Sequence, residues 1–311
     1  MLPNLPASFR VSPDVVRSLD LKMPIVALES TVITHGLPRP DNLSLAHDME
    51  IAVQDNGALP ATIGILDGKV IVGLSDAELN RLAYAENPLK VSARDFGAAI
   101  AKRAHGGTTV AGTLLAASKT GIRVFATGGI GGVHRWPAHD VSADLPALAK
   151  YPVIVVCAGA KAILDLPATL EVLETLSVPV IGYQTDDFPA FYSRESGLKV
   201  PHRADSPEEV ADIARAHWDL GLESAVLVVV PPPEEAAMPY EQVEGAIAQA
   251  LEESKAQGVR GQASTPFLLA RVSELTGHAS LRANVALLKN NAAVAAQIAR
   301  ALFPAQATYR V

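Results

Sequence analysis

Short apolar runs alternate with helix-like segments along most of this 311-residue chain. Residues 153–158 and 226–230 are apolar runs of strand length, whereas residues 42–54 have the composition and end signals of a helix. This alternation is typical of a layered α/β domain. Since no fixed-period repeat or long flexible linker interrupts it, we predict a single three-layer α/β/α domain over residues 1–311. Its central sheet should be mostly parallel or mixed, with residues 1–20 as an N-terminal extension or helix.

The charge balance excludes several classes of protein. A net charge of -7 and a pI of about 5.6 argue against non-specific binding to nucleic acid or membrane surfaces, which needs many basic residues. The apolar runs are far shorter than the roughly 20 residues that span a bilayer, and the N-terminus lacks the pattern of a secretory signal. Cys157 is the only cysteine, which excludes an internal disulfide and predicts a small buried core residue. We therefore expect a cytoplasmic protein.

Lys161 is the residue that most strongly indicates chemistry. It follows the apolar strand predicted at 153–158, with only Gly159 and Ala160 between, and we predict that a helix spans 161–175. Burial and the positive end of a helix dipole both disfavour the ammonium form, so this amine would be nucleophilic toward an aldehyde. Because lysines are rare in such apolar settings, a Schiff-base role is favoured over a structural one.

Two further charged residues lie at strand or helix ends, where their roles stay open. Glu29 follows the strand predicted at 24–28, where a partly buried carboxyl would be a general acid near neutral pH. The alternative is that Glu29 caps backbone or pairs with an arginine. Lys90 is a possible ligand-binding cation, although most lysines are solvated surface groups.

Three polar segments are candidates for anion or metal binding. The stretch 106–113 is rich in Gly and Thr before a predicted helix, which suits a phosphate or a plain helix cap about equally. Glycines 128–132 do not match a dinucleotide-binding motif, but they would allow close approach of a ligand, with Arg135 as a possible phosphate ligand. Asp140 and Asp144 either cap a helix or hold a hard divalent cation.

Together these segments resemble the pseudouridine-5′-phosphate glycosidase family, also called indigoidine synthase A-like proteins. The resemblance runs from about Pro24 to Arg300. The motifs that carry it are Ala27-Leu-Glu-Ser-Thr31 with His35-Gly36, Ala61-Thr-Ile-Gly-Ile-Leu-Asp-Gly68, residues 106–110, Phe125-Ala-Thr-Gly-Gly-Ile-Gly-Gly-Val-His-Arg135, Val141-Ser-Ala-Asp-Leu145, Val155-Val-Cys-Ala-Gly-Ala-Lys161, Gly182-Tyr183, Phe188-Pro-Ala-Phe191 and Ser264-Thr-Pro-Phe-Leu-Leu-Ala-Arg271.

The resemblance implies a homotrimer that needs one Mn²⁺ per subunit and reversibly cleaves pseudouridine 5′-phosphate to uracil and ribose 5-phosphate. Lys161 would be the nucleophile that forms a ring-opened ribose adduct, Glu29 the proton donor, and Asp140 the metal ligand. The substrate-binding residues that the resemblance implies are Lys90, Val110, Ser142, Ala143, Asp144, Thr127, His134 and Asn284. The partners would be small molecules, without nucleic acid or membrane.

Three departures from the family pattern bear on substrate detail. The connection between Arg135 and Asp140 is short and contains Trp136 in place of a glycine. Ala93 stands where many relatives carry arginine, and Val230 replaces an asparagine of an Ala-Asn-Pro-Ile-Pro pattern. Two other functions stay open at this point: another phosphosugar lyase that uses a Schiff-base lysine, and a non-catalytic metabolite-binding protein.

Overall fold

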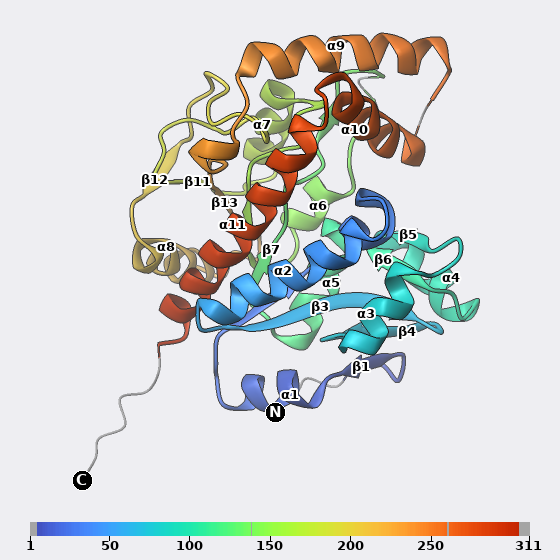
Figure 1. Cartoon of the computed structure of the whole chain (residues 1–311). Coiled ribbons are helices and arrows are strands. Elements are labelled where there is room, and N and C mark those ends of the chain that lie inside the picture. The colour runs from blue at the N-terminus through green and yellow to red at the C-terminus, as the bar shows by residue number, and fades with distance from the viewer. Residues whose placement is uncertain (1–4, 138, 260, 305–311) are drawn as a thin grey trace.

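The computed structural model describes residues 5–137, 139–259 and 261–304 (Figure 1). The strands are β1 (Phe9–Val11), β2 (Ile25–Leu28), β3 (Leu59–Leu66), β4 (Lys69–Val72), β5 (Leu89–Val91), β6 (Gly106–Thr108), β7 (Val124–Ala126), β8 (Val133–His134), β9 (Ile154–Cys157), β10 (Leu164–Asp165), β11 (Val180–Tyr183), β12 (His202–Ala204) and β13 (Val226–Val229). The α-helices are α1 (Pro13–Asp20), α2 (Asp41–Asp55), α3 (Asp76–Ala83), α4 (Phe96–Ala101), α5 (Val110–Thr120), α6 (Asp144–Leu148), α7 (Leu166–Thr175), α8 (Pro207–Asp219), α9 (Tyr240–Ala256), α10 (Ser264–Leu275) and α11 (Ala279–Leu302).

Eleven strands form one mixed sheet, ordered β1-β4-β3-β2-β7-β9-β13-β11-β12, with β6 joining β3 and β5 joining β6. The run from β3 through β2, β7, β9, β13 and β11 to β12 is parallel throughout. The central strands β2, β9 and β13 are buried along their whole length, as expected when helices cover both faces of a parallel sheet. Antiparallel pairing joins β3 to β4 and to β6.

Helices pack on both faces of this sheet, which makes three layers (Figure 1). The long helix α11 lies across one face, where it contacts β2, β7 and β9 and packs between α2 and α8. Helix α5 packs against β2, β4 and β6, and it also contacts α6. The pair α9 and α10 lies at one end of the molecule, beyond the sheet (Figure 1). The predicted α/β class and the mostly parallel sheet are therefore confirmed.

The helix predicted at 161–175 is wrong at its start, because α7 begins only at Leu166. The Asp165 side chain accepts the N–H of Ala168 and caps the helix, and proline follows within the first turn. Lys161 instead lies in an irregular turn between β9 and β10, so the proposed effect of a helix dipole on its amine does not apply. The C-terminal helix α11 begins at Ala279 and includes the whole Ala-rich stretch 291–302.

The N-terminal region is part of the fold. Strand β1 pairs in parallel with β4, and α1 follows directly, capped by the Ser12 hydroxyl. Cys157 is fully buried, as predicted, and burial raises the pKa of its thiol to about 12. In the part of the chain that the structure describes, none of the helices has the length and apolar character needed to cross a bilayer.

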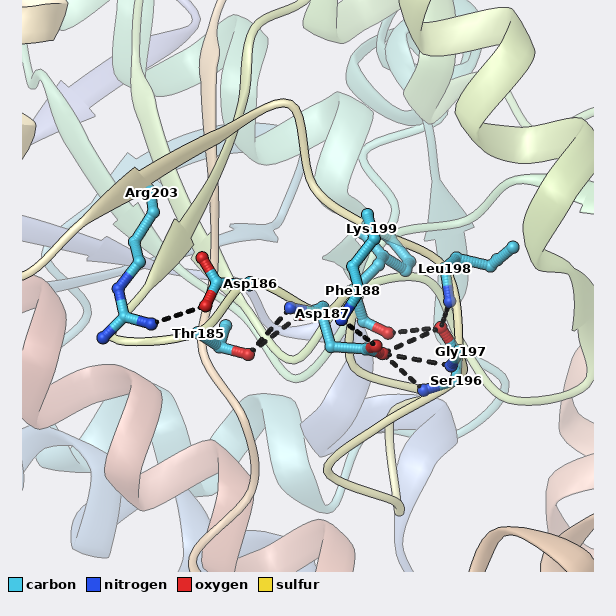
Figure 2. Close-up of polar contacts among 9 residues, drawn as sticks. All are labelled: Thr185, Asp186, Asp187, Phe188, Ser196, Gly197, Leu198, Lys199 and Arg203. Carbon is cyan, nitrogen blue, oxygen red and sulfur yellow. Dashed lines mark hydrogen bonds and ion pairs between the residues drawn. The ribbon is translucent and has the colours of Figure 1, made fainter.

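A carboxylate organises the loop between β11 and β12 (Figure 2). The buried Asp187 accepts the N–H groups of Ser196 and Gly197 at 2.8 and 3.1 Å, which ties the two arms of the loop together. At the loop tip, the N–H of Phe191 donates to the carbonyl of Ala158 at 3.1 Å. The loop is therefore fastened to the turn that carries Lys161.

Candidate active site

The site lies where three adjacent parallel strands end. Strands β2, β7 and β9 are neighbours in the sheet, and Glu29, Thr127 and Lys161 follow their carboxyl ends. Ligands of open α/β sheets bind at this edge, because the loops that follow the strands converge there. The structure thus brings together the two residues that the resemblance implies as catalytic, Lys161 and Glu29.

Glu29 is held by two hydroxyl groups. Its side chain is almost fully buried, at 7% exposure, and its two carboxylate oxygens accept hydrogen bonds from Thr31 and Thr127. Thr127 is itself fully buried and lines neither of the cavities described below. Its contact with Glu29 therefore gives it a positioning role, rather than the direct substrate contact that the resemblance implies.

Lys161 is placed by backbone hydrogen bonds and by Arg135. The Lys161 N–H donates to Ile130 at 3.0 Å, and the turn closes with a bond from Leu164 back to the Lys161 carbonyl. The Arg135 guanidinium donates to the carbonyls of Ala162 and Leu164, each at 3.0 Å. The segment after Lys161 is thus braced at two points.

Arg135 also binds a carboxylate from a distant helix. It makes a bidentate pair with Glu244 of α9, with both N–O distances at 2.7 Å. With its donors used in this way, and since it does not line the polar cavity described below, the hypothesis that Arg135 binds phosphate is wrong. Arg135 instead joins α9 to the turn of the candidate nucleophile.

Two lysines lie close enough to influence each other. Burial lowers the pKa of Lys90, and the positive charge of Lys161 lowers it further, against the opposing effects of Asp144 and Glu29. Burial and the charge of Lys90 also lower the pKa of His35. The interpretation of Lys90 as a solvated surface group is therefore not supported: Lys90 is a partly buried cation beside the candidate nucleophile.

A polar cavity of about 330 Å³ opens on one side of these lysines. Most of the predicted substrate-binding residues line it, together with the predicted metal ligand. The residues of this polar cavity are Thr31, Lys90, Ser92, Arg94, Asp95, Thr109, Val110, Gly131, His134, Asp140, Val141, Ser142, Ala143, Asp144, Lys161, Leu164, Gly261 and Thr265. Lys90 and Arg94 among them are cations that suit an anionic group such as a phosphate.

Both carboxylate oxygens of Asp144 accept hydrogen bonds from the protein backbone. One carboxylate oxygen accepts the N–H of Ala111 in the first turn of α5 at 2.9 Å, and the other accepts the N–H of Gly131 at 2.8 Å. A methyl group on Gly131 would come within 2.8 Å of this second oxygen, so glycine is needed there for a protein contact. Asp144 thus joins α5 to the strand-end loop at the floor of the polar cavity.

Asp140 is suited to hold a divalent cation with few protein ligands. It lines the polar cavity beside His134, whose pKa burial lowers against the opposing effect of Asp140. Among the described residues, the one group of three potential ligands with converging atoms is His47, Glu50 and Asp76, which does not line this cavity. A single carboxylate plus water fits a hard ion such as Mn²⁺, which prefers oxygen ligands.

A second, mostly apolar cavity of about 600 Å³ meets the polar one. The two share Thr31, Lys90, Lys161 and Thr265. The residues of this apolar cavity are Glu29, Thr31, Val32, His35, Gly36, Leu37, Pro38, Lys90, Gly128, Gly129, Lys161, Phe191, Tyr192, Thr265, Pro266, Leu269, Ala270, Ser273, Glu274, His278, Ser280, Leu281, Asn284 and Leu288. Both lysines therefore lie at the boundary between the polar cavity and the apolar cavity.

Several residues of these cavities were not predicted as site residues. Arg94 and Ser92 line the polar cavity, although nothing in their local sequence distinguishes them from surface or capping residues, whereas Thr109, which also lines it, belongs to the stretch 106–113 that was a candidate for anion binding. The buried Asn291 donates to the carbonyl of Thr127 at 2.9 Å and so ties α11 to the end of β7. The predicted Asn284 does line the apolar cavity, about two helical turns before this anchor on the same face of α11.

The Arg135 contacts predict an effect on rate. We expect Arg135→Lys to lower kcat about 10- to 100-fold, because a lysine cannot hold two carbonyls and a carboxylate at once, and small displacements of a reacting group are costly. Glu244→Gln leaves the hydrogen bonds from Arg135 to the two carbonyl groups in place, so its kcat should fall much less. Steady-state kcat, measured together with the thermal midpoint of each variant, checks this. Equal kcat in wild type and Arg135→Lys would contradict it.

Known proteins match this sequence over nearly the whole chain. The chain is 52% identical over 292 residues to a protein of Solibacter usitatus named pseudouridine-5′-phosphate glycosidase, covering 93% of this chain and 98% of that one. A protein of the same name from Geobacillus kaustophilus is 52% identical over 293 residues, covering 94% and 97%.

Two solved structures also superpose closely. The prealnumycin C-glycosynthase AlnA, in complex with ribulose 5-phosphate, gives a TM-score of 0.89 at 41% identity, covering 96% of this chain and 98% of that one. An indigoidine synthase A-like protein from Thermotoga maritima gives 0.87 at 35% identity, with the same coverage. The sequence model described as indigoidine synthase A like protein matches residues 14–301. With these sequence matches and the strand-end site, the chain belongs to the indigoidine synthase A-like family.

Proposed function

We propose that this protein is a pseudouridine-5′-phosphate glycosidase, which reversibly converts pseudouridine 5′-phosphate and water to uracil and ribose 5-phosphate. The observation that carries the proposal is the position of Lys161 between two chambers, with Lys90 beside it and Glu29 on the apolar side. The polar cavity would hold the phosphate and ribose, and the apolar cavity the base. The relatives of about 50% identity that bear this name support it.

The proposed reaction begins with attack by the neutral amine of Lys161 on C1′ of the ribose. The C1′–O4′ bond breaks, O4′ takes the proton that the attacking amine loses, and the sugar becomes a ring-opened adduct on nitrogen. The nitrogen lone pair then forms a C=N bond while the C1′–C5 bond to uracil breaks, and C5 takes a proton from Glu29. Water hydrolyses the iminium, which releases ribose 5-phosphate and restores the amine. A C–C bond needs this assistance from the nitrogen lone pair because it has no heteroatom to protonate.

The neighbours of Lys161 support these steps electrostatically. Lys90 lies near Lys161 as a partly buried cation, whose pKa is lowered by burial and by the charge of Lys161, and it would bind an anionic part of the substrate. Thr31 and Thr127 hold the Glu29 carboxyl at the end of β2 by hydrogen bonds. There it lines the apolar cavity, which would hold the base. The hydrogen bonds from Arg135 limit the movement of the turn while Lys161 attacks the ribose.

Asp140 is the residue that we propose to hold Mn²⁺, which when bound would orient polar groups of the substrate and its water. Chelation should therefore lower activity by at least about 100-fold, since a catalytic cation contributes several kcal/mol, and added Mn²⁺ should restore it. Asp140→Asn should bind Mn²⁺ more weakly, as measured by electron paramagnetic resonance of the free ion. Activity that survives exhaustive chelation would contradict the metal role. The homotrimer remains a prediction, testable by light scattering.

The function is tested by incubating the purified protein with pseudouridine 5′-phosphate and Mn²⁺ and measuring uracil by liquid chromatography. Uracil and ribose 5-phosphate should appear in equal amounts. A lyase that uses a Schiff-base lysine on other sugar phosphates would form a borohydride-reducible adduct with ribose 5-phosphate but release no uracil. A non-catalytic binding protein would do neither.

A further inference from the structure

A second group of candidate metal ligands lies outside the two cavities. His47 and Glu50 belong to α2, and Asp76 is the first residue of α3. One ligand atom from each of these three side chains lies within 4.8 Å of the other two. None of the three lines the polar or the apolar cavity. This group, which we call the α2–α3 cluster, is therefore separate from the candidate active site.

The packing of α3 against α2 brings the three side chains together. His47 and Glu50 are three residues apart, so they are neighbours on one face of α2. Asn42, in the first turn of α2, donates to the carbonyl of Ala83 at the end of α3, at 3.4 Å. Glu50, further along α2, meets Asp76 at the start of α3. The two helices thus run antiparallel, and apolar side chains of both share one small buried cluster that holds them in place.

Glu50 is the member of the cluster that most needs a cation. Burial raises the pKa of its carboxyl, and the negative charge of Asp76 raises it further, while His47 is the one described charged group that opposes this rise. In the described part of the chain, neither Glu50 nor Asp76 forms an ion pair with a lysine or an arginine. The buried Thr62 donates its hydroxyl to Glu50 at 2.5 Å, as groups around a metal site do when they orient a ligand.

We propose that the α2–α3 cluster binds one Zn²⁺ ion, with His47, Glu50 and Asp76 as ligands and water in the fourth position. Zn²⁺ takes imidazole nitrogen and carboxylate oxygen in the same tetrahedral site, whereas Mg²⁺ and Ca²⁺ prefer oxygen ligands alone. At metal–ligand distances of about 2.0–2.2 Å, the ligand atoms of such a site lie about 3.4 Å apart. Rotation of the exposed Asp76 side chain closes the remaining gap.

The ion has a structural role, because its ligands lie outside both cavities. It joins the start of α3 to α2, whereas the hydrogen bond from Asn42 already joins the end of α3 to the same helix. Both helices also pack against residues 32–36, the segment that follows Thr31. Binding energy at the α2–α3 cluster is therefore folding energy for this part of the chain.

The test is calorimetric titration of Zn²⁺ into metal-free Asp140→Asn protein, in which the proposed Mn²⁺ ligand of the polar cavity is removed. One Zn²⁺ should bind per chain, and free Zn²⁺ at about 100 times its Kd should raise the thermal midpoint by about 5 °C. Adding His47→Ala or Asp76→Asn to this protein should weaken Zn²⁺ binding at least about 100-fold. Asp55→Asn, which changes an exposed carboxylate at the end of α2, is the matched control and should bind Zn²⁺ normally.

The two ligand variants keep the inference falsifiable. Asp76 is exposed, so Asp76→Asn should fold and decides the question even if His47→Ala does not fold. Failure of the Asp140→Asn protein to bind Zn²⁺ overturns the inference. Equal Zn²⁺ affinity with and without Asp76→Asn places the ion elsewhere and overturns it as well. Zn²⁺ binding at the α2–α3 cluster without a rise in the thermal midpoint contradicts the structural role.

Discussion

Uracil release from pseudouridine 5′-phosphate should fall by at least about 10⁴-fold when Lys161 is replaced by methionine, because the nucleophile that forms the covalent adduct is lost. Methionine keeps most of the unbranched stem, and Lys161 is only half-buried, so the fold should tolerate the change. The measurement is kcat from the initial rate of uracil formation. In parallel, borohydride reduction with ribose 5-phosphate should label the wild-type protein by one sugar phosphate and should not label the variant.

A matched control is Lys119→Met, which removes an exposed lysine from the last turn of α5. It should retain both the activity and the single label. If Lys161→Met still released uracil at more than a few per cent of the wild-type rate, Lys161 would not be the nucleophile. If Lys161→Met took up the label at another residue, Lys90 would be the next candidate, because it borders the same two cavities.

The sequence predicts the centre of the fold well because buried parallel strands are short and strongly apolar. Strands β2, β9 and β13 lie within the runs predicted at 24–28, 153–158 and 226–230. The helix after Lys161 was misplaced because the apolar pattern of residues 162–164 is the same in a turn and a short strand as in a helix. The signals that mark the true start of α7 are Asp165 as its N-cap and Pro167 in its first turn.

The chemistry of the site was predictable where it follows a strand end. Glu29 and Lys161 come directly after apolar strands, and adjacent parallel strands place such residues together. The role of Arg135 was not predictable, because its partner Glu244 lies 109 residues away. The same holds for the apolar cavity, whose walls come from the loop of Phe191 and from α10 and α11. Their apolar residues look like ordinary core positions until the chain is folded.

Glu29→Gln should lower kcat for uracil release by about 10²- to 10⁴-fold, the usual contribution of a general acid. Glutamine has almost the same shape and its amide oxygen still accepts a hydrogen bond, so the variant separates proton transfer from packing. The label left by borohydride and ribose 5-phosphate should persist, because that adduct forms on Lys161. Thr127→Val is the matched control: it removes one hydrogen bond to Glu29 but leaves the carboxyl group, and should cost far less than Glu29→Gln. Unchanged kcat in Glu29→Gln, or a loss as large in Thr127→Val, would mean that the carboxyl group only holds the ends of β2 and β7 in place.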